Sequence, residues 1–265
     1  MPFLRMGEKC THTEGIFTMK ILLLNGSMRG DSSSSLKVAK AFVKGIVQVC
    51  PDAEVTEVKL RDKKIEHCLG CLSCWKNDRG HCILHDDMDE LRDMVMASDV
   101  IIESFPLYFF GLPSKMKAFM DRMISHVSEY RGKNGNDDTG SFLHTMRYEE
   151  LMKKKLVLCS ACGYEETTGC YDSIKLQYDT ICGKGNYTLI TASQGGMLAE
   201  STLQAKVEKY MVKYTEAGVE FAKTGKVSDE TYEKLAVPML GHNTFERIIN
   251  LNWDDPNVGP YGRRG

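Results

Sequence analysis

Four cysteines stand close together in one stretch of the 265-residue sequence. Cys68, Cys71 and Cys74 are each separated by two residues, and seven residues then lead to Cys82. Three cysteines at this spacing can bind three irons of an iron–sulfur cubane, as in bacterial ferredoxin sequences. The stretch before Cys82, which contains Gly80, gives Cys82 room to turn back to the fourth iron. The spacing therefore suits a single [4Fe-4S] cluster.

Other chemistries remain open for these four thiols. Four thiolates also bind zinc, although structural zinc sites usually separate two cysteine pairs by a longer stretch. A redox disulfide and a set of free thiols are further alternatives. His67, His81 and His85 flank the cysteines. We expect these histidines to be exposed loop residues rather than ligands, because four sulfurs already complete an iron–sulfur site.

A second stretch whose residues could bind a ligand follows the apolar run from Lys20 to Asn25. It contains glycines, several serines and one arginine. Exposed amides at a helix start, short hydroxyls and a guanidinium are donors that can converge on a phosphate. A solvated turn with an ordinary helix N-cap is the competing interpretation, but the position after a strand and the arginine favour phosphate. The candidate phosphate-binding residues are Ser27, Arg29, Ser32, Ser33 and Ser34.

An aromatic loop follows a later strand-like run, from Phe105 to Pro113. A flat ring such as isoalloxazine needs aromatic or apolar contact together with backbone amides aimed at its polar edge. A loop of aromatic residues stiffened by two prolines offers both. The competing interpretation is core packing, which we expect for at least one of Phe109 and Phe110. The candidate ring-binding residues are Pro106, Leu107, Tyr108 and Phe109.

Both loops resemble those of the NADPH-dependent FMN reductase and iron–sulfur flavoprotein group of the flavodoxin-like superfamily. The first loop of that group reads Gly-Ser-Pro-Arg, two variable residues and three small polar residues. This chain has Met28 in place of the proline and Ser33 where asparagine is common. The resemblance covers roughly residues 19–224. The residues that match the two motifs are Gly26, Ser27, Arg29, Ser32, Ser33, Ser34, Pro106, Tyr108, Lys117, Phe119, Asp121 and Arg122.

The resemblance implies that FMN binds at these loops and that a third loop, carrying Cys162 and Gly163, contacts the edge of its ring. It also implies that NAD(P)H is the electron donor and that a quinone, a flavin or another small molecule is the acceptor. We assign no catalytic residue, because flavin N5 itself carries hydride chemistry. We expect Asp121 and Arg122 to form an ion pair on a helix. The cysteine motif resembles that of the iron–sulfur flavoproteins, including the Asp-Asp-Met that follows at residues 86–88.

Two other classes of function compete with this enzyme. One is an electron carrier that docks redox proteins such as ferredoxin and has no small substrate. The other is a structural zinc-loop protein with an empty flavin pocket, which the two flavin loops argue against. The resemblance further implies a homodimer or a higher assembly, and the long segment at residues 129–148 is a candidate for contact with a partner.

Composition narrows the setting of the chain. Hydrophobic residues make up 42% and charged residues 26%, as in an ordinary globular protein. The net charge of −2 argues against nucleic acid and acidic membranes as partners. No run approaches the roughly 20 apolar residues that span a bilayer. Residues 1–18 lack the apolar core of a signal peptide. Since the cysteines are clustered rather than spread, we expect a cytoplasmic protein with metal or redox chemistry.

Five strand-like runs alternate with helical patterns, which requires a parallel sheet covered by helices on both faces. From this alternation and the resemblance described above, which implies a flavodoxin-like fold, we expect an α/β, doubly wound five-stranded sheet of order 2-1-3-4-5, with ligands beyond the carboxyl ends of the strands. The sheet and its helices should occupy residues 19–224, with extensions at 1–18 and 225–265. Strands are expected at 20–25, 54–60, 99–104, 156–160 and 187–192. Helices are expected at 34–49, after a cap at 86–87, and at 113–126, 168–182 and 200–223, with a polar loop at 130–140.

Overall fold

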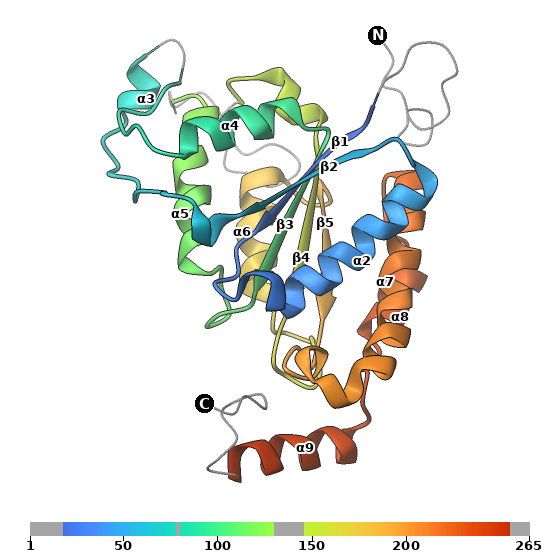
Figure 1. Cartoon of the computed structure of the whole chain (residues 1–265). Helices are drawn as coiled ribbons and strands as arrows, with labels where there is room; N and C mark the ends of the chain where they lie inside the picture. The colour runs from blue at the N-terminus through green and yellow to red at the C-terminus, as the bar shows by residue number, and fades with distance from the viewer. Residues whose placement is uncertain (1–17, 78–79, 130–145, 255–265) are drawn as a thin grey trace.

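A five-stranded sheet forms the centre of the computed structural model, which describes residues 18–77, 80–129 and 146–254 (Figure 1). The strand order is β2-β1-β3-β4-β5, and every pairing is parallel. This confirms the predicted order and places all five carboxyl ends at one edge. The strands are β1 (Lys20–Asn25), β2 (Glu54–Lys59), β3 (Val100–Pro106), β4 (Lys155–Ala161) and β5 (Tyr187–Ala192).

Helices cover both faces of the sheet, as Figure 1 shows. One face carries α2 (Ser34–Val49) and α7 (Gln204–Thr224). The other carries α4 (Met88–Ala97), α5 (Ser114–Arg122) and α6 (Asp172–Cys182). The remaining α-helices described are α3 (Ser73–Lys76), α8 (Asp229–Ala236) and α9 (His242–Asp254). Short 3-10 turns lie at Gly30–Ser32, Leu60–Asp62, Met123–His126, Glu149–Lys153, Met197–Ala199 and Ser201–Leu203.

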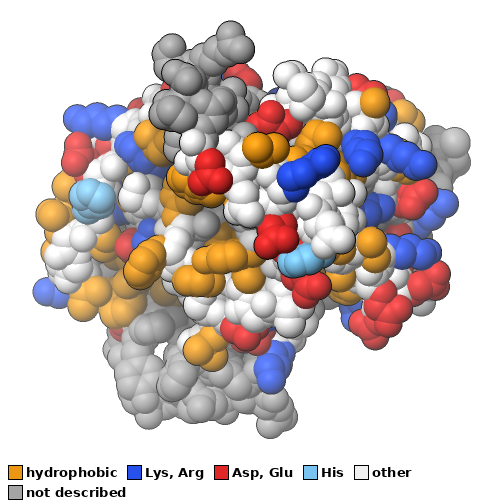
Figure 2. Space-filling model, turned by 90° about the horizontal axis from the view of Figure 1, so that it is seen from below, with side chains coloured by type: hydrophobic (Ala, Val, Ile, Leu, Met, Phe, Trp, Pro, Cys, Tyr) orange, Lys and Arg blue, Asp and Glu red, His pale blue; other side chains and the backbone are white. Residues whose placement is uncertain are grey.

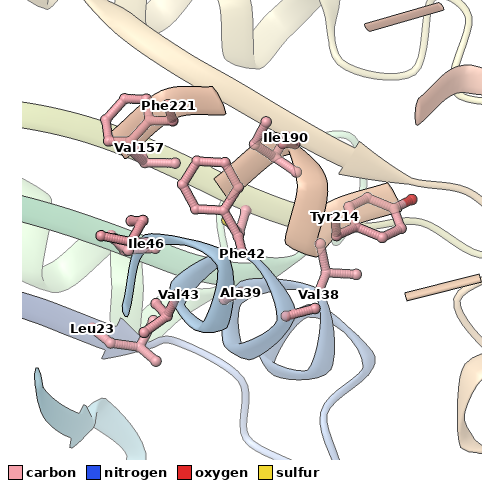
Figure 3. Close-up of a cluster of buried hydrophobic side chains, with 14 of the residues drawn as sticks. Leu23, Val38, Ala39, Phe42, Val43, Ile46, Val157, Ile190, Tyr214 and Phe221 are labelled. Carbon is pink, nitrogen blue, oxygen red and sulfur yellow. The ribbon is translucent and has the colours of Figure 1, made fainter. Parts of the chain in front are cut away.

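The core between the sheet and the pair α2 and α7 is built from aliphatic and aromatic side chains (Figure 3). Phe42 and Phe221 pack ring against ring, with their centroids 5.4 Å apart. The two helices approach closely because each has a glycine at the crossing. A Cβ on Gly45 would lie 1.9 Å from the Thr215 carbonyl oxygen, and one on Gly218 would lie 2.0 Å from that of Phe42. Any side chain at either position would push the helices apart.

A carboxyl group is also buried on the α6 side of the sheet. Glu103 lies in the middle of β3 and is almost completely buried. The hydroxyl of Tyr178 on α6 donates a hydrogen bond to it. Burial raises the pKa of Glu103 to about 7, although this hydrogen bond opposes the shift.

Several helix boundaries differ from those expected. The helix expected at 113–126 is α-helical only to Arg122 and ends in a 3-10 turn. The helix expected from residue 168 begins at Asp172, because Gly169 adopts a φ of 72° and makes a turn first. The helix expected from residue 200 begins at Gln204, after a 3-10 turn. The polar loop expected at 130–140 lies outside the described residues.

The segment after α7 runs back over the sheet. The ammonium of Lys213 donates hydrogen bonds to the carbonyls at the end of α8, which lies against β5. The Gln194 side chain bonds both the N–H and the carbonyl of Leu240, and His242 of α9 pairs with Glu165 at 2.8 Å. These contacts hold α9 below the carboxyl edge of the sheet (Figure 1). Within the described ranges, no helix is long and apolar enough to cross a membrane.

Candidate active site at the carboxyl edge

The predicted phosphate loop joins β1 to α2. The buried Ser27 hydroxyl accepts a hydrogen bond from the Arg29 N–H at 3.2 Å. The exposed Ser32 hydroxyl donates to the Arg29 carbonyl at 3.0 Å. These contacts shape the turn around the backbone of Arg29, a residue that is half-buried. These side-chain hydrogen bonds order the loop without a ligand.

The other serines of this loop lie at the start of α2. Ser33 is the N-cap residue, and its hydroxyl accepts a hydrogen bond from the Leu36 N–H. The Ser34 hydroxyl donates to the Gly195 carbonyl at 2.5 Å, which ties the loop to the segment after β5. Ser35 is buried, and its hydroxyl has no protein partner among the described residues. The first turn of an α-helix has amide donors without intrahelical partners, which is a property that an anion site needs.

Two basic residues beside this loop were missed by sequence reasoning. Arg61 donates a hydrogen bond to the Met28 carbonyl at 3.3 Å, and Lys59 pairs with Asp31 at 2.7 Å. Both follow from the parallel pairing of β1 with β2, whose carboxyl ends meet at this edge. The sequence of β2 gave no signal that Lys59 and Arg61 lie beside this loop, because their position depends on which strand pairs with β1.

The aromatic loop makes a tight turn just after β3. Tyr108 and Gly111 exchange two backbone hydrogen bonds, at 3.1 and 2.9 Å. Phe109 and Phe110 lie between them with φ values of 50° and 61°. Residues other than glycine, asparagine and aspartate rarely adopt such values, and two in succession store strain of the kind found at functional sites.

The two phenylalanines do not pack in the core, so the expectation that at least one of them does is wrong. Phe109 is fully exposed, and Phe110 and Tyr108 are about half exposed. The Phe110 ring stacks on Tyr164 of the next loop, with centroids 5.7 Å apart. Pro106 and Leu107 are half-buried at the base of the turn. Seen from this end of the molecule, hydrophobic side chains gather on the surface (Figure 2).

The third predicted loop follows β4. The backbone of Cys162 is already bonded on both sides, to the Ala192 carbonyl and to the Gly195 N–H. Its side chain is only 2% exposed, so Cys162 has no free polar group to offer a ring. Gly163 and Tyr164 are exposed and stand next to the aromatic loop. The structure therefore brings all three predicted loops to one edge.

The four clustered cysteines line one small cavity. It is bounded by Cys68, Cys71, Cys74 and Cys82, with Arg122 at its wall. Burial, and then the electrostatic effect of the neighbouring cysteines Cys82, Cys68 and Cys71, raise the pKa of Cys74. Hydrogen bonds from Ser73 lower the pKa of Cys71. In the part of the chain that the structure describes, no three His, Cys, Asp or Glu side chains approach closely enough to hold a single metal ion. The three nearby histidines are exposed, as expected.

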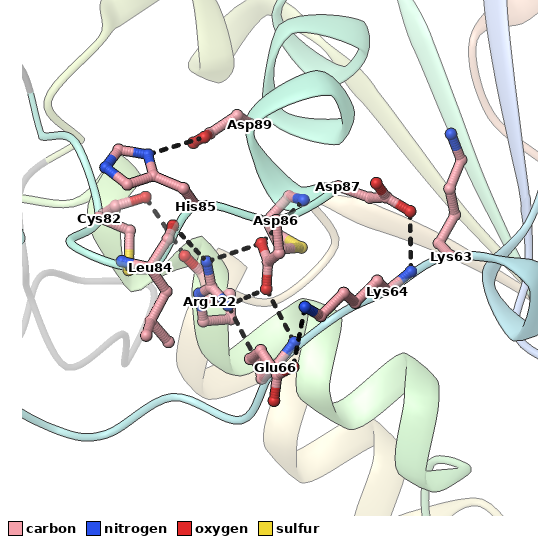
Figure 4. Close-up of polar contacts among 12 residues, drawn as sticks. Lys63, Lys64, Glu66, Cys82, Leu84, His85, Asp86, Asp87, Asp89 and Arg122 are labelled. Atoms are coloured by element: carbon pink, nitrogen blue, oxygen red, sulfur yellow. Dashed lines mark hydrogen bonds and ion pairs between the residues drawn. The ribbon is translucent and has the colours of Figure 1, made fainter.

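Arg122 does not pair with Asp121, which corrects the expected ion pair. Its guanidinium binds both carboxylate oxygens of Asp86, at 2.8 and 3.0 Å, and donates to the Glu66 and Leu84 carbonyls (Figure 4). The two charged side chains are 1% and 0% exposed. Asp121 pairs with Lys117 at 2.5 Å on the outer face of α5. Neighbours in sequence on a helix point in different directions, which explains the difference.

Asp86 holds this part of the chain together. Its carboxylate also accepts hydrogen bonds from the N–H groups of Glu66 and Met88, so Asp86 supports the start of α4. The Asp87 side chain, expected to share this cap, instead accepts a hydrogen bond from the Lys64 N–H. Burial alone would raise the pKa of Asp86, but the hydrogen bonds from Arg122, Glu66 and Met88 outweigh it and lower the pKa.

The cysteine cavity lies far from the aromatic loop within one chain. Helix α5 begins just after that loop, and the 3-10 turn that follows the helix, with Ile124 and Ser125, forms part of the cavity wall. The Trp75 indole N–H donates to the Ile124 carbonyl, which fixes α3 at this end. Figure 1 shows α3 and α9 at opposite ends of the molecule. The expectation that the cysteine loop reaches the carboxyl-end crevice is therefore wrong.

A doubly wound parallel sheet of this order, with a serine-rich turn after β1 and exposed rings after β3, defines a flavodoxin-like protein. Comparison with known families agrees. The chain belongs to the family described as having a flavodoxin-like fold, whose model matches residues 19–197.

Curated relatives match part of the chain. An iron-sulfur flavoprotein of Archaeoglobus fulgidus is 40% identical over 84 residues, which covers 31% of this chain and 37% of the relative. An FMN-dependent NADH:quinone oxidoreductase of Azospirillum brasilense is 32% identical over 120 residues, which covers 43% of this chain and 58% of the relative. The chain thus spans between about a third and three fifths of the length of these relatives.

Solved structures share the fold over a longer stretch. An FMN-dependent NADH-azoreductase from Bacillus anthracis, in complex with FMN, covers 77% of this chain and 100% of its own, with a TM-score of 0.53 and 18% identity. An NAD(P)H:quinone oxidoreductase from Methanothermobacter marburgensis gives the same coverage and identity with a TM-score of 0.54. At this identity the likeness supports the fold.

Proposed function

We propose that this protein is an FMN-dependent oxidoreductase that passes electrons from NAD(P)H to a quinone-type or other small acceptor. The observation that carries the proposal is the meeting of a serine-rich turn at a helix start and a strained, exposed aromatic turn at one edge of the sheet. The relatives named as FMN-dependent NADH:quinone oxidoreductases supply the reaction class. When bound, FMN would accept hydride at N5 and release the electrons to the acceptor.

Different loops would bind different parts of FMN. The turn at Ser27 and Arg29 and the start of α2 would hold the phosphate. Leu107, Tyr108 and Phe109 would contact the flavin ring from one side, and Gly163 would allow close approach of the backbone at its edge. No acid or base is required from the protein. Because Phe109 is fully exposed, it would exclude water from the ring only when a ligand or a second copy covers it.

Replacing Arg29 by alanine should weaken FMN binding roughly ten- to a hundredfold. The substitution removes one charge-assisted hydrogen bond, a contribution of about 1.5–3 kcal/mol. Fluorescence titration of flavin-free protein with FMN measures the change. Lys40→Ala, on the exposed face of α2, is a matched control and should bind FMN as the parent does. Equal FMN affinity in the Arg29 variant and the parent would remove Arg29 from the site.

We include a [4Fe-4S] cluster held by Cys68, Cys71, Cys74 and Cys82 in the proposal. The four thiols border one cavity, and the Arg122 guanidinium lies beside Cys82. A single zinc would need all four sulfurs within about 2.3 Å of one ion, whereas a cubane spreads them over separate irons. The cavity measures about 20 Å³, so the loop would have to widen around a cluster. The exposed position of Cys71 permits this movement. When bound, the cluster would take up one electron at a time.

Replacing any one of these four cysteines by serine should lose most of the iron while leaving FMN bound. Loss of one ligand destabilises the whole cluster, whereas the flavin loops lie at the other end of α5. Iron, sulfide, zinc and flavin contents after anaerobic purification measure the outcome. Cys182→Ser, outside the cavity, is the control and should retain full iron. Stoichiometric zinc in the parent, or four free thiols with undiminished activity, would contradict the cluster.

A second candidate function is an electron carrier that docks redox proteins. The observation in its favour is the rim of the cysteine cavity, where Leu69, Leu72 and Ile83 expose apolar surface away from the flavin edge. Steady-state oxidation of NADH or NADPH with a soluble quinone separates the two functions. Turnover with the quinone alone supports the enzyme, and turnover only after addition of a ferredoxin-type protein supports the carrier.

We also propose a homodimer or a higher assembly. The fully exposed Phe109 and the half-exposed Tyr108, Phe110 and Tyr164 lie together at the flavin edge. An apolar surface of this kind is typical of a binding or subunit contact. The segment 129–148, proposed above for partner contact, lies mostly outside the described residues.

A further inference from the structure

Two further cysteines lie together beside the third loop, outside the cysteine cavity. Cys162 directly follows β4, and Cys170 lies just before α6. The carbonyl oxygen of Glu166 is 3.9 Å from the Cys162 sulfur and 3.6 Å from the Cys170 sulfur. Burial, and then the neighbouring Cys170 thiol as charge and as hydrogen-bonding partner, raise the pKa of Cys162 to about 11. Two thiols held against one oxygen are poised to react with each other.

The local fold brings this pair together. Gly169, with its φ of 72°, reverses the chain, and the Cys170 N–H bonds the Thr167 carbonyl at 3.1 Å. The buried Tyr171 then donates a hydrogen bond from its hydroxyl to Ser160 of β4 at 3.1 Å. This bond fixes the start of α6 against the strand from which Cys162 emerges. The proximity of the two sulfurs is therefore set by the backbone and not by mobile side chains.

We propose that Cys162 and Cys170 form an intramolecular disulfide when the protein meets a hydroperoxide. The more accessible Cys170 reacts first, because it is partly exposed whereas Cys162 is 2% exposed. The Cys170 sulfur attacks the peroxide, so that an S–O bond forms, the O–O bond breaks and water or an alcohol leaves. The Cys162 sulfur then attacks the Cys170 sulfur, the S–S bond forms, and the S–O bond breaks. The leaving hydroxide takes the Cys162 proton and departs as water.

The disulfide would close the segment 162–170, which contacts both the aromatic turn and α9. Tyr164 in this segment stacks on Phe110, and Glu165 pairs with His242 of α9. Oxidation would therefore fix a loop whose side chains contact both the aromatic turn and α9. The inference depends on the two sulfurs alone and stands whether or not FMN binds.

Peptide mapping of the full chain tests the proposal. The protein is reduced, freed of reductant, treated with one equivalent of hydrogen peroxide, and alkylated after denaturation. Trypsin and a glutamyl protease, which cleaves after Glu165 and Glu166, separate Cys162 from Cys170. The expected product is a pair of peptides joined by a disulfide, with the loss of two hydrogen atoms. Fragmentation distinguishes Cys162 from Cys159, which shares its peptide.

Two variants sharpen the result. Cys182→Ser, at the end of α6, should form the same disulfide as the parent. Cys170→Ser should lose the linked peptides and leave Cys162 fully alkylated. Accumulation of Cys170 as sulfinic acid beside an alkylated Cys162 would overturn the proposal. A linkage to any other cysteine, or oxidation confined to the four cysteines of the cavity, would overturn it as well.

Discussion

Replacing Arg122 by methionine should lower the free energy of unfolding by about 3–5 kcal/mol, because it leaves the Asp86 carboxylate buried without its partner. Both side chains are almost fully buried, so solvent does not screen the lost interaction. Denaturant unfolding followed by circular dichroism measures the difference. The matched control is Lys117→Met, which removes an exposed pair with Asp121 and should cost less than about 1 kcal/mol.

The pH dependence gives a second readout for this pair. Because the pKa of Asp86 is lowered in the folded protein, its stabilising contribution is present above the unfolded pKa of about 3.9 and is lost as the pH falls through the folded value. The penalty in Arg122→Met should therefore shrink in acid. Adding Asp86→Asn should recover part of the stability at neutral pH. An Arg122 variant as stable as the Lys117 variant would contradict the role assigned to this pair.

Replacing Glu103 by glutamine should stabilise the protein in alkaline conditions, by up to about 3 kcal/mol at pH 8. The folded pKa of Glu103, about 7, lies above its unfolded value of 4.5. The folded protein therefore keeps a proton that the unfolded chain has lost, and stability falls as the pH rises between these two values. Glutamine stays neutral and still accepts the hydrogen bond from Tyr178.

The measurement is the unfolding free energy of parent and variant from pH 5 to pH 9. The gain should be small near pH 5, grow toward pH 7, and level off above it. Cys182, near Glu103, is present in both parent and variant, and burial raises its pKa to about 12, so it stays protonated in the folded protein over this range. Glu54→Gln, on the exposed start of β2, is the control and should show no such trend. A gain independent of pH would show that Glu103 is not protonated in the folded protein.

The sheet could be predicted because its strands carry their own signal. β1 and β3 are short, almost continuous apolar runs, and only buried parallel strands require this pattern. The serine-rich turn after β1 was identified for the same local reason. The helix starts could be predicted less well. The turn at Gly169, which has a positive φ, places the start of α6 at Asp172 instead of residue 168.

The contacts between distant elements could not be predicted from the same patterns. The partner of Arg122 comes from a segment before α4, and nothing near Arg122 in sequence distinguishes Asp86 from Asp121. The exposure of Phe109 was missed because an aromatic residue beside an apolar strand is usually buried. The place of the cysteines was missed because it depends on a contact with the end of α5. This helix is part of a crossover, which must carry the chain back to the amino edge of the sheet, and the cysteines pack where it ends.

The contacts described for the cysteine segment are with α5, the 3-10 turn after it and the start of α4, and this has a consequence for how such a protein can change over evolutionary time. Its anchors are Arg122, Ile124 and Asp86, whereas the core between α2, α7 and the sheet shares no residue with it. Substitutions of the four cysteines should therefore leave the core between α2, α7 and the sheet unchanged. A lineage can gain or discard the cysteines without passing through an unfolded intermediate, provided that the buried arginine and aspartate are retained.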